Sequence, residues 1–117
     1  MKLMHVTIQT DKFEKEIEFY EKFAGLKVMQ DMRPMGKNIV FLAEDKTDTC
    51  IEVIENKDAE NAGNINLSIG FHAEDTDAKR NELATAGFEP TPVISPMPGV
   101  SFFFVKDPAG VTVQFIC

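Results

Sequence analysis

The sequence predicts an α+β fold in which two tandem βαβββ modules form curved mixed sheets around a cleft. Two observations lead to this prediction. The order strand, helix and three strands occurs twice along the 117 residues. Equivalent positions also recur at matched intervals in the two copies. In the first copy 20 residues separate His5 from the helix-ending Gly25, and in the second 19 residues separate Ser68 from Gly87. Two copies at a period of about 62 residues indicate a pair of modules rather than a solenoid of short repeats.

The modules are expected to form one domain, residues 1–117. Alternation, apolar stripes and turn signals predict their elements. In the first module, residues 1–55, these are a strand at 3–10, a helix at 12–25, and strands at 26–32, 39–44 and 48–55. A solvated linker is expected at 56–64. In the second module, residues 65–117, they are a strand at 65–74, a helix at 76–87, an irregular edge strand at 88–96, and strands at 101–107 and 111–116.

Both helices carry start and stop signals. Thr10 or Asp11 is expected to cap the first helix and Asp75 the second, because their side chains can accept from unpaired backbone N–H groups. Gly25 and Gly87 are placed to end the helices in a left-handed turn. The first helix also carries an apolar stripe at helical spacing, formed by Phe13, Ile17, Tyr20 and Ala24.

The composition is that of a soluble globular domain and argues against several classes of function. Hydrophobic residues make up 44% of the chain, and the formal net charge is −7. Because no lysine or arginine cluster offsets this charge, nucleic acid is not an expected partner. No signal peptide or membrane-spanning run is present, so we expect a cytoplasmic protein without membrane contact. The two cysteines, Cys50 and Cys117, make no disulfide framework, which agrees with a reducing compartment.

Four strands have one apolar face and one mixed face, because successive residues of a strand point to opposite sides of its sheet. The mixed faces hold His5 and Glu52 in the first module, and Ser68 and Gln114 in the second. The two positions lie 47 residues apart in the first module and 46 residues apart in the second. If the curved sheets face each other, these four side chains gather in one cleft. In the alternative, they are the solvent-facing residues of ordinary antiparallel sheets.

Four stretches of the chain are similar to the vicinal oxygen chelate superfamily of glyoxalase I, fosfomycin and bleomycin resistance proteins and extradiol dioxygenases. The stretches are 4–28, 51–53, 68–88 and 102–115, and they include "FYEKFAGL" and "DPAG". The resemblance covers nearly the whole chain. It implies paired βαβββ modules with a cleft between them, a homodimer and a small-molecule ligand or substrate.

In metal-dependent members of that superfamily, each module supplies ligands from its first and fourth strands. The resemblance therefore implies His5, Glu52 and Gln114 as metal ligands, with Ser68 at the fourth equivalent position. Imidazole and carboxylate suit Zn, Ni, Fe or Mn, whereas a serine hydroxyl is a poor ligand and a glutamine amide brings no charge. With a neutral histidine the four groups carry a single negative charge, so we expect a divalent metal to be weakly bound or absent.

The incomplete ligand set and the abundance of Met and Phe favour a protein that acts on or binds a small, partly apolar molecule. The residues expected to line its pocket are Thr7, Cys50, Ser68, Gly70, His72, Phe102, Phe104 and Thr112. The alternative is a metal-dependent lyase, isomerase or dioxygenase with His5 and Glu52 as core ligands.

Authentic glyoxalase I activity is not expected from this sequence. Its isomerisation needs a base that removes a proton next to a carbonyl. Gln114 cannot ionise, so Glu52 is the candidate catalytic residue among the four. Arg33 and Arg80, the only arginines, offer few cationic anchors for glutathione.

Overall fold

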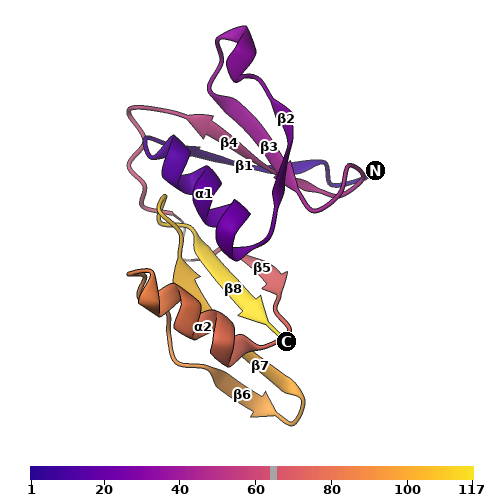
Figure 1. The fold of residues 1–117 in the computed structure, drawn as a ribbon, viewed down its shortest axis with the longest axis vertical. Helices are drawn as coiled ribbons and strands as arrows, with labels where there is room; N and C mark the ends of the chain where they lie inside the picture. The colour runs from indigo at the N-terminus through magenta and orange to yellow at the C-terminus, as the bar shows by residue number, and fades with distance from the viewer. Residues whose placement is uncertain (64–65) are drawn as a thin grey trace. The chain divides into compact units, whose positions relative to one another are not determined.

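The helices and strands follow one another in the order that the sequence predicts, and the predicted α+β fold of two tandem βαβββ modules is confirmed. The computed structural model describes residues 1–63 and 66–117. Asn64 and Ile65, the expected end of the linker and start of the next strand, lie outside the described residues. The chain divides into two compact units, Met1–Asn61 (unit 1) and Ala62–Cys117 (unit 2), each with one four-stranded mixed sheet and one α-helix (Figure 1).

Unit 1 has the strand order β1-β4-β3-β2. Its elements are β1 (His5–Thr10), α1 (Phe13–Phe23), β2 (Lys27–Asp31), the short 3₁₀ helix η1 (Arg33–Met35), β3 (Ile39–Ala43) and β4 (Cys50–Glu55). The first and last strands, β1 and β4, pair in parallel, and the other neighbours are antiparallel. The helix η1 connects β2 to β3, and Gly36 ends it in the left-handed conformation.

Unit 2 repeats this topology with the strand order β5-β8-β7-β6. Its elements are β5 (Ser68–His72), α2 (Thr76–Thr85), β6 (Ile94–Met97), β7 (Val100–Lys106) and β8 (Thr112–Ile116). Again the first and last strands, β5 and β8, pair in parallel. The proline-containing β6 lies at the sheet edge, as the sequence predicts, but it covers Ile94–Met97 instead of the expected 88–96, and its pairing with β7 is irregular.

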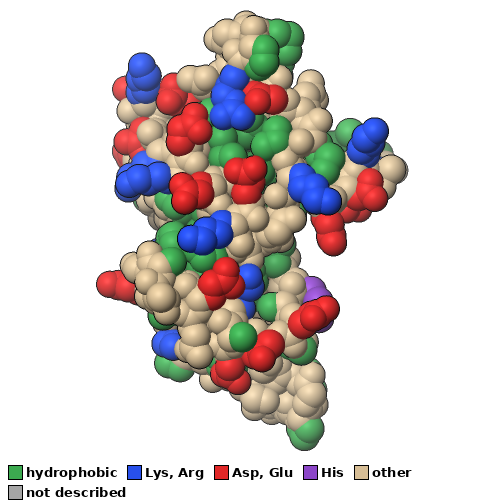
Figure 2. Space-filling model, in the orientation of Figure 1, with side chains coloured by type: hydrophobic (Ala, Val, Ile, Leu, Met, Phe, Trp, Pro, Cys, Tyr) green, Lys and Arg blue, Asp and Glu red, His purple; other side chains and the backbone are tan. Residues whose placement is uncertain are grey.

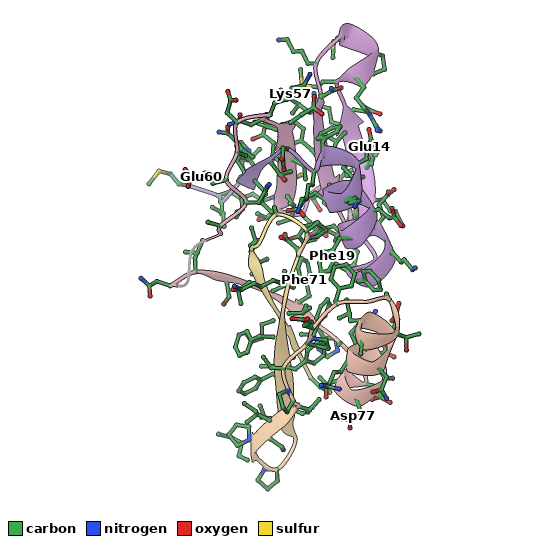
Figure 3. The ribbon with its side chains drawn as sticks, turned by 90° about the vertical axis from the view of Figure 1, so that its left-hand side faces the viewer. Glu14, Phe19, Lys57, Glu60, Phe71 and Asp77 are labelled. Atoms are coloured by element: carbon green, nitrogen blue, oxygen red, sulfur yellow. The ribbon has the colours of Figure 1, made fainter. Side chains whose placement is uncertain are left out.

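The apolar face of each sheet is covered by the helix of the same unit, as alternation predicts. In unit 1, α1 lies across the face that buries Val40, Leu42 and Val53 (Figure 1). In unit 2, Phe103 and Val113 are completely buried on the face toward α2. Figure 3 shows α2 on one side of this sheet and side chains projecting from the opposite side. We call that opposite side of each sheet its open face.

The cap predicted for the first helix is wrong. Lys12, not Thr10 or Asp11, holds the cap position of α1 and makes no side-chain cap hydrogen bond. The Thr10 hydroxyl instead accepts from the backbone N–H of Lys12 itself, at 3.0 Å. The prediction for the second helix is confirmed, because the Asp75 carboxylate accepts from the backbone N–H of Ala78 at 3.0 Å.

The first part of the expected linker belongs to unit 1 and is hydrogen-bonded to β1. The Asn56 backbone N–H donates to the Thr10 carbonyl at 2.9 Å, and its side chain donates to the Gln9 amide oxygen at 3.0 Å. The Thr10 hydroxyl also lies 2.6 Å from the Asn61 side-chain oxygen. This part of the expected linker therefore continues the hydrogen bonding of β1.

The "DPAG" turn before β8 is built around the buried carboxylate of Asp107. One of its oxygens accepts from the backbone N–H groups of Ala109 and Val111, each at 2.9 Å. Gly63 packs directly against this turn: a Cβ added at Gly63 would lie 2.1 Å from the Gly110 carbonyl oxygen. Gly63 also has a φ of +63°, a conformation that glycine adopts without steric cost.

Charged side chains of both signs cover the face of the molecule shown in Figure 2. Acidic and basic groups are interspersed there, and no large patch of one sign forms on that face. Within the described residues, no helix is long and apolar enough to span a bilayer.

Candidate functional site

Glu52 lies at the centre of the open face of unit 1. It is paired with Thr7 of β1 on one side and with Phe41 of β3 on the other. The Thr7 hydroxyl donates to the Glu52 carboxylate at 2.5 Å. Only 13% of the Glu52 side chain is exposed, so the carboxylate is held in place within this row of three residues.

His5 completes this arrangement from the next pair along β1. Its Nε2 atom lies 3.6 Å from the Glu52 carboxylate, and its ring meets the edge of the Phe41 ring with 5.8 Å between centroids. The His5 side chain is 45% exposed. A half-exposed imidazole and a largely buried carboxylate thus lie close together on the same side of the sheet.

The separation of these two atoms is compatible with a shared divalent ion. A tetrahedral ion with ligand atoms about 2.1 Å away separates its ligand atoms by about 3.4 Å. The observed 3.6 Å is close to this value, and Thr7 would orient the carboxylate as an outer hydrogen-bond partner. Across residues 1–63 and 66–117, however, no three His, Cys, Asp or Glu side chains gather to hold a metal. Among the described residues, His5 and Glu52 therefore bring only two groups of this kind together, and their role as metal ligands stays a prediction.

Gln114 lies at the centre of the open face of unit 2. It is paired with Gly70 of β5 and with Phe104 of β7. A Cβ added at Gly70 would lie 3.6 Å from the Gln114 amide oxygen, so this oxygen rests over the bare backbone of the glycine. Next to this row, Ser68 is exposed and pairs with Thr112, which in turn pairs with Lys106.

A pocket of about 590 Å³ lies in unit 2. Its walls come from the segment after α2 and from strands β7 and β8. The lining residues are Gly87, Phe88, Glu89, Thr91, Phe104, Val105, Lys106 and Thr112. The pocket combines aromatic rings with two hydroxyls, one ammonium and one carboxylate, which is the usual composition of a small-molecule site.

Two of the residues predicted to line a pocket, Phe104 and Thr112, therefore share one cavity. Phe102 lies beside it, with its ring edge-on to that of Phe104 at 5.7 Å between centroids. Cys50 is half-buried opposite His5, on the strand that carries Glu52. His72 is exposed at the end of β5, paired with Ile116. The expected cleft that gathers His5, Glu52, Ser68 and Gln114 stays a prediction.

Sequence reasoning missed the wall of the pocket formed by residues 87–91. Arg80 positions this wall, because its guanidinium donates to the carbonyl oxygens of Thr91 at 2.7 Å and Pro90 at 3.2 Å. The Arg80 residue is half-buried. Lys106 was also missed, yet the alternation that places Phe104 on the open face places Lys106 there too.

Both arginines are engaged within their own units. Arg33 makes a two-pronged contact with Asp31, with N–O distances of 2.9 and 2.8 Å, and lies 3.6 Å from Glu14. Hydrogen bonding from Arg33 lowers the pKa of Asp31, and the same bond raises the pKa of Arg33. Neither guanidinium is positioned in the lining of the pocket.

The fold agrees with the comparisons with known proteins. The chain belongs to the Glyoxalase/Bleomycin resistance protein/Dioxygenase superfamily, whose family model matches residues 2–115. The resemblance inferred from the sequence is thereby confirmed. Members of this superfamily commonly use divalent metals, bind small molecules and often form dimers.

Individual relatives include enzymes and resistance proteins. The lactoylglutathione lyase of Neisseria meningitidis is 28% identical over 124 residues, which cover 99% of this chain and 90% of the relative. The trypanothione-dependent glyoxalase I of Leishmania major has a similar fold, with a TM-score of 0.73 and 23% identity over 99% of this chain and 86% of that one. The fosfomycin resistance protein FosX of Listeria monocytogenes gives a TM-score of 0.79 at 14% identity, covering 99% and 92%. This chain is a glyoxalase-like protein of the superfamily.

Proposed function

We propose that this protein binds a small, partly apolar organic molecule in the pocket of unit 2. The observation that supports this best is the pocket itself. Its volume of about 590 Å³ is within the range of ligand sites, about 300–1,000 Å³. Phe88 and Phe104 offer ring surfaces to an apolar body, while the hydroxyls and charged groups can orient a polar end.

The engagement of both arginines supports a ligand other than a glutathione conjugate. Glutathione carries two carboxylates, and paired anionic groups are best held by guanidinium groups that bind in a two-pronged manner. Arg33 is bound to Asp31, and Arg80 is bound to the chain segment that forms the pocket wall. Lys106 is the one cationic side chain among the residues that line the pocket in the described part of the chain.

A neutral aromatic compound, 2-naphthamide, tests the proposal by isothermal titration calorimetry. We expect it to bind, and we expect Phe104→Ala to weaken binding about tenfold because a large apolar contact is lost. Phe41→Ala is the matched control, since Phe41 holds the equivalent position in unit 1 and should leave the affinity unchanged. An equal loss of affinity in both variants would overturn the proposal.

The arrangement of His5, Glu52 and Thr7 supports a second candidate, a metal-dependent lyase, isomerase or dioxygenase. A divalent ion held by His5 and Glu52 would polarise an oxygen atom of the substrate. The chain's own contribution would be to fix the carboxylate through the Thr7 hydroxyl and to present the imidazole on the open face.

Because this candidate site offers only His5 and Glu52 as protein ligands, we expect it to bind a metal weakly. Purified protein should hold substoichiometric transition metal, and EDTA should barely change its melting temperature. A stoichiometric metal that raises the melting temperature by mass action would instead favour the enzyme. His5→Ala would then have to abolish that stabilisation for His5 to be a ligand.

A further inference from the structure

We propose that the pocket of unit 2 selects small aromatic monocarboxylates, with Lys106 as the anchor of the carboxylate. This inference rests on the proposed function and goes beyond it by naming the chemical class of ligand. Three features of the pocket support it: the position of Lys106, the charge around it, and the rings beside it.

Lys106 and Thr112 form a direct pair across the antiparallel strands β7 and β8. The Cβ atoms of such a pair lie about 5 Å apart on the same face of the sheet, and both residues line the pocket. An ammonium group and a hydroxyl can therefore donate to the same ligand group. Two donors side by side suit a carboxylate.

Lys106 has no acidic partner within the described residues. No carboxylate of residues 1–63 or 66–117 lies within 4 Å of its ammonium group, whereas Lys79 pairs with Glu82 at 3.0 Å. Glu89 lines the same pocket but forms no ion pair with Lys106. The ammonium is thus available to an anionic ligand. The negative charge of Glu89 disfavours a second anionic group, so the ligand is a monoanion.

The ring surfaces lie next to this charged end. Phe104 is two residues before Lys106 on the same face of β7, and Phe88 lines the wall that follows α2. Phe104 is half-buried, so part of its ring faces the pocket, and the edge-on contact with Phe102 extends the aromatic surface along the strand. Stacked or edge-on contacts with such rings favour an aromatic ligand body.

A matched pair of ligands, 2-naphthoate and 2-naphthamide, tests this inference by calorimetry at low ionic strength with the full chain. The two differ in charge but hardly in shape. We expect the carboxylate to bind about tenfold more tightly than the amide, because a charge-assisted hydrogen bond is lost with the amide. Added salt should reduce this preference.

Lys106→Gln should abolish the preference for naphthoate, so that the variant binds naphthoate and naphthamide with equal affinity. Lys106→Arg, which keeps the charge, should retain the preference. Lys27→Gln is the control for net charge, because Lys27 is an exposed residue of β2 in unit 1, and it should also retain the preference. The melting temperatures of the variants establish that each is folded.

The outcomes separate this inference from the proposed function. Equal affinity of the wild-type protein for both compounds, or an undiminished preference in Lys106→Gln, would overturn the inference alone. Tighter binding of L-phenylalanine than of 3-phenylpropanoate would also overturn it, because Glu89 would then be recognising an ammonium group. If naphthamide and naphthoate both fail to bind, the proposed function itself is wrong.

Discussion

Glu52 and Gln114 hold the same position in the two sheets. Each lies on the strand between the first and third strands of its unit, and each pairs with a phenylalanine of the third strand, Phe41 or Phe104. The residue on the other side differs: Thr7 donates a hydrogen bond to Glu52, whereas Gly70 leaves space beside Gln114. The two units thus share a framework, and one has a carboxylate where the other has a neutral amide.

Glu52→Gln should remove any stabilisation of the protein by zinc or manganese. The variant loses the charged ligand but keeps an oxygen that can accept from Thr7. Without metal, the cost in unfolding free energy should therefore be below about 1 kcal/mol. Thermal melts with and without the metal measure both effects. Glu55→Gln on the same strand is the control, and a metal-dependent shift that survives in Glu52→Gln would exclude this carboxylate as a ligand.

Phe103→Ala should destabilise the protein by about 3–5 kcal/mol, because it leaves a cavity in a packed core. The Phe103 side chain is completely buried and stacks on Phe115 with 5.5 Å between ring centroids. Phe102→Ala changes the neighbouring residue on the open face and should cost about 1 kcal/mol or less. Urea unfolding compares the two, and equal losses would contradict the assignment of the faces.

Gly63→Ala should cost at least about 3 kcal/mol, because a left-handed backbone and an overpacked contact both penalise the new methyl group. The methyl carbon would lie 2.1 Å from the Gly110 carbonyl oxygen. Gly99→Ala separates the two effects, since Gly99 has a φ of +82° and open space around it. It should cost about 1–2 kcal/mol. Similar losses in both variants would show that Gly63 is not closely packed.

Asp75→Ala should destabilise the protein by about 1 kcal/mol, the usual cost of losing a helix cap. The carboxylate accepts from the Ala78 backbone N–H, which has no partner within the helix. Lys12→Ala at the equivalent position of α1 should have almost no effect, because Lys12 makes no side-chain cap. Chemical unfolding of both variants tests this asymmetry between the helices.

Asp31 should make the stability of the protein depend on pH in the acidic range. The bond from Arg33 lowers the pKa of Asp31 in the folded state. Its contribution is therefore present above the unfolded-state pKa of about 3.9 and is lost as the pH falls through the lower folded-state pKa. We expect the melting temperature of Asp31→Asn to fall less steeply below about pH 4 than that of the wild type. Parallel curves for the two proteins would contradict this.

Local patterns predict the elements and their faces well, because alternation and burial have the same period in a strand. In "SFFFV", alternation predicts that Phe103 faces away from Phe102 and Phe104, and the structure buries Phe103 while the other two are half-buried. The register also places Glu52 and Gln114 at equivalent positions, as their spacing predicts.

The pocket wall and the start of α1 could not be predicted in this way. Residues 88–96 contain prolines and lack periodicity, so nothing local indicates which way they turn. Their position depends on Arg80, whose bonds to Pro90 and Thr91 span 10 and 11 residues. Likewise, Thr10 accepts from Lys12 rather than from a later N–H, and this depends on how β1 leads into the helix.

The parallel pairing of first and last strands affects how the nascent chain folds on the ribosome. Unit 1 can close its sheet as soon as β4 emerges, while unit 2 is still being translated. In unit 2, β8 lies between β5 and β7, so both expose an unsatisfied backbone edge until the final strand is synthesised. Exposed edges of this kind invite pairing between chains. The interval before β8 is released is therefore when a newly made molecule is most susceptible to aggregation.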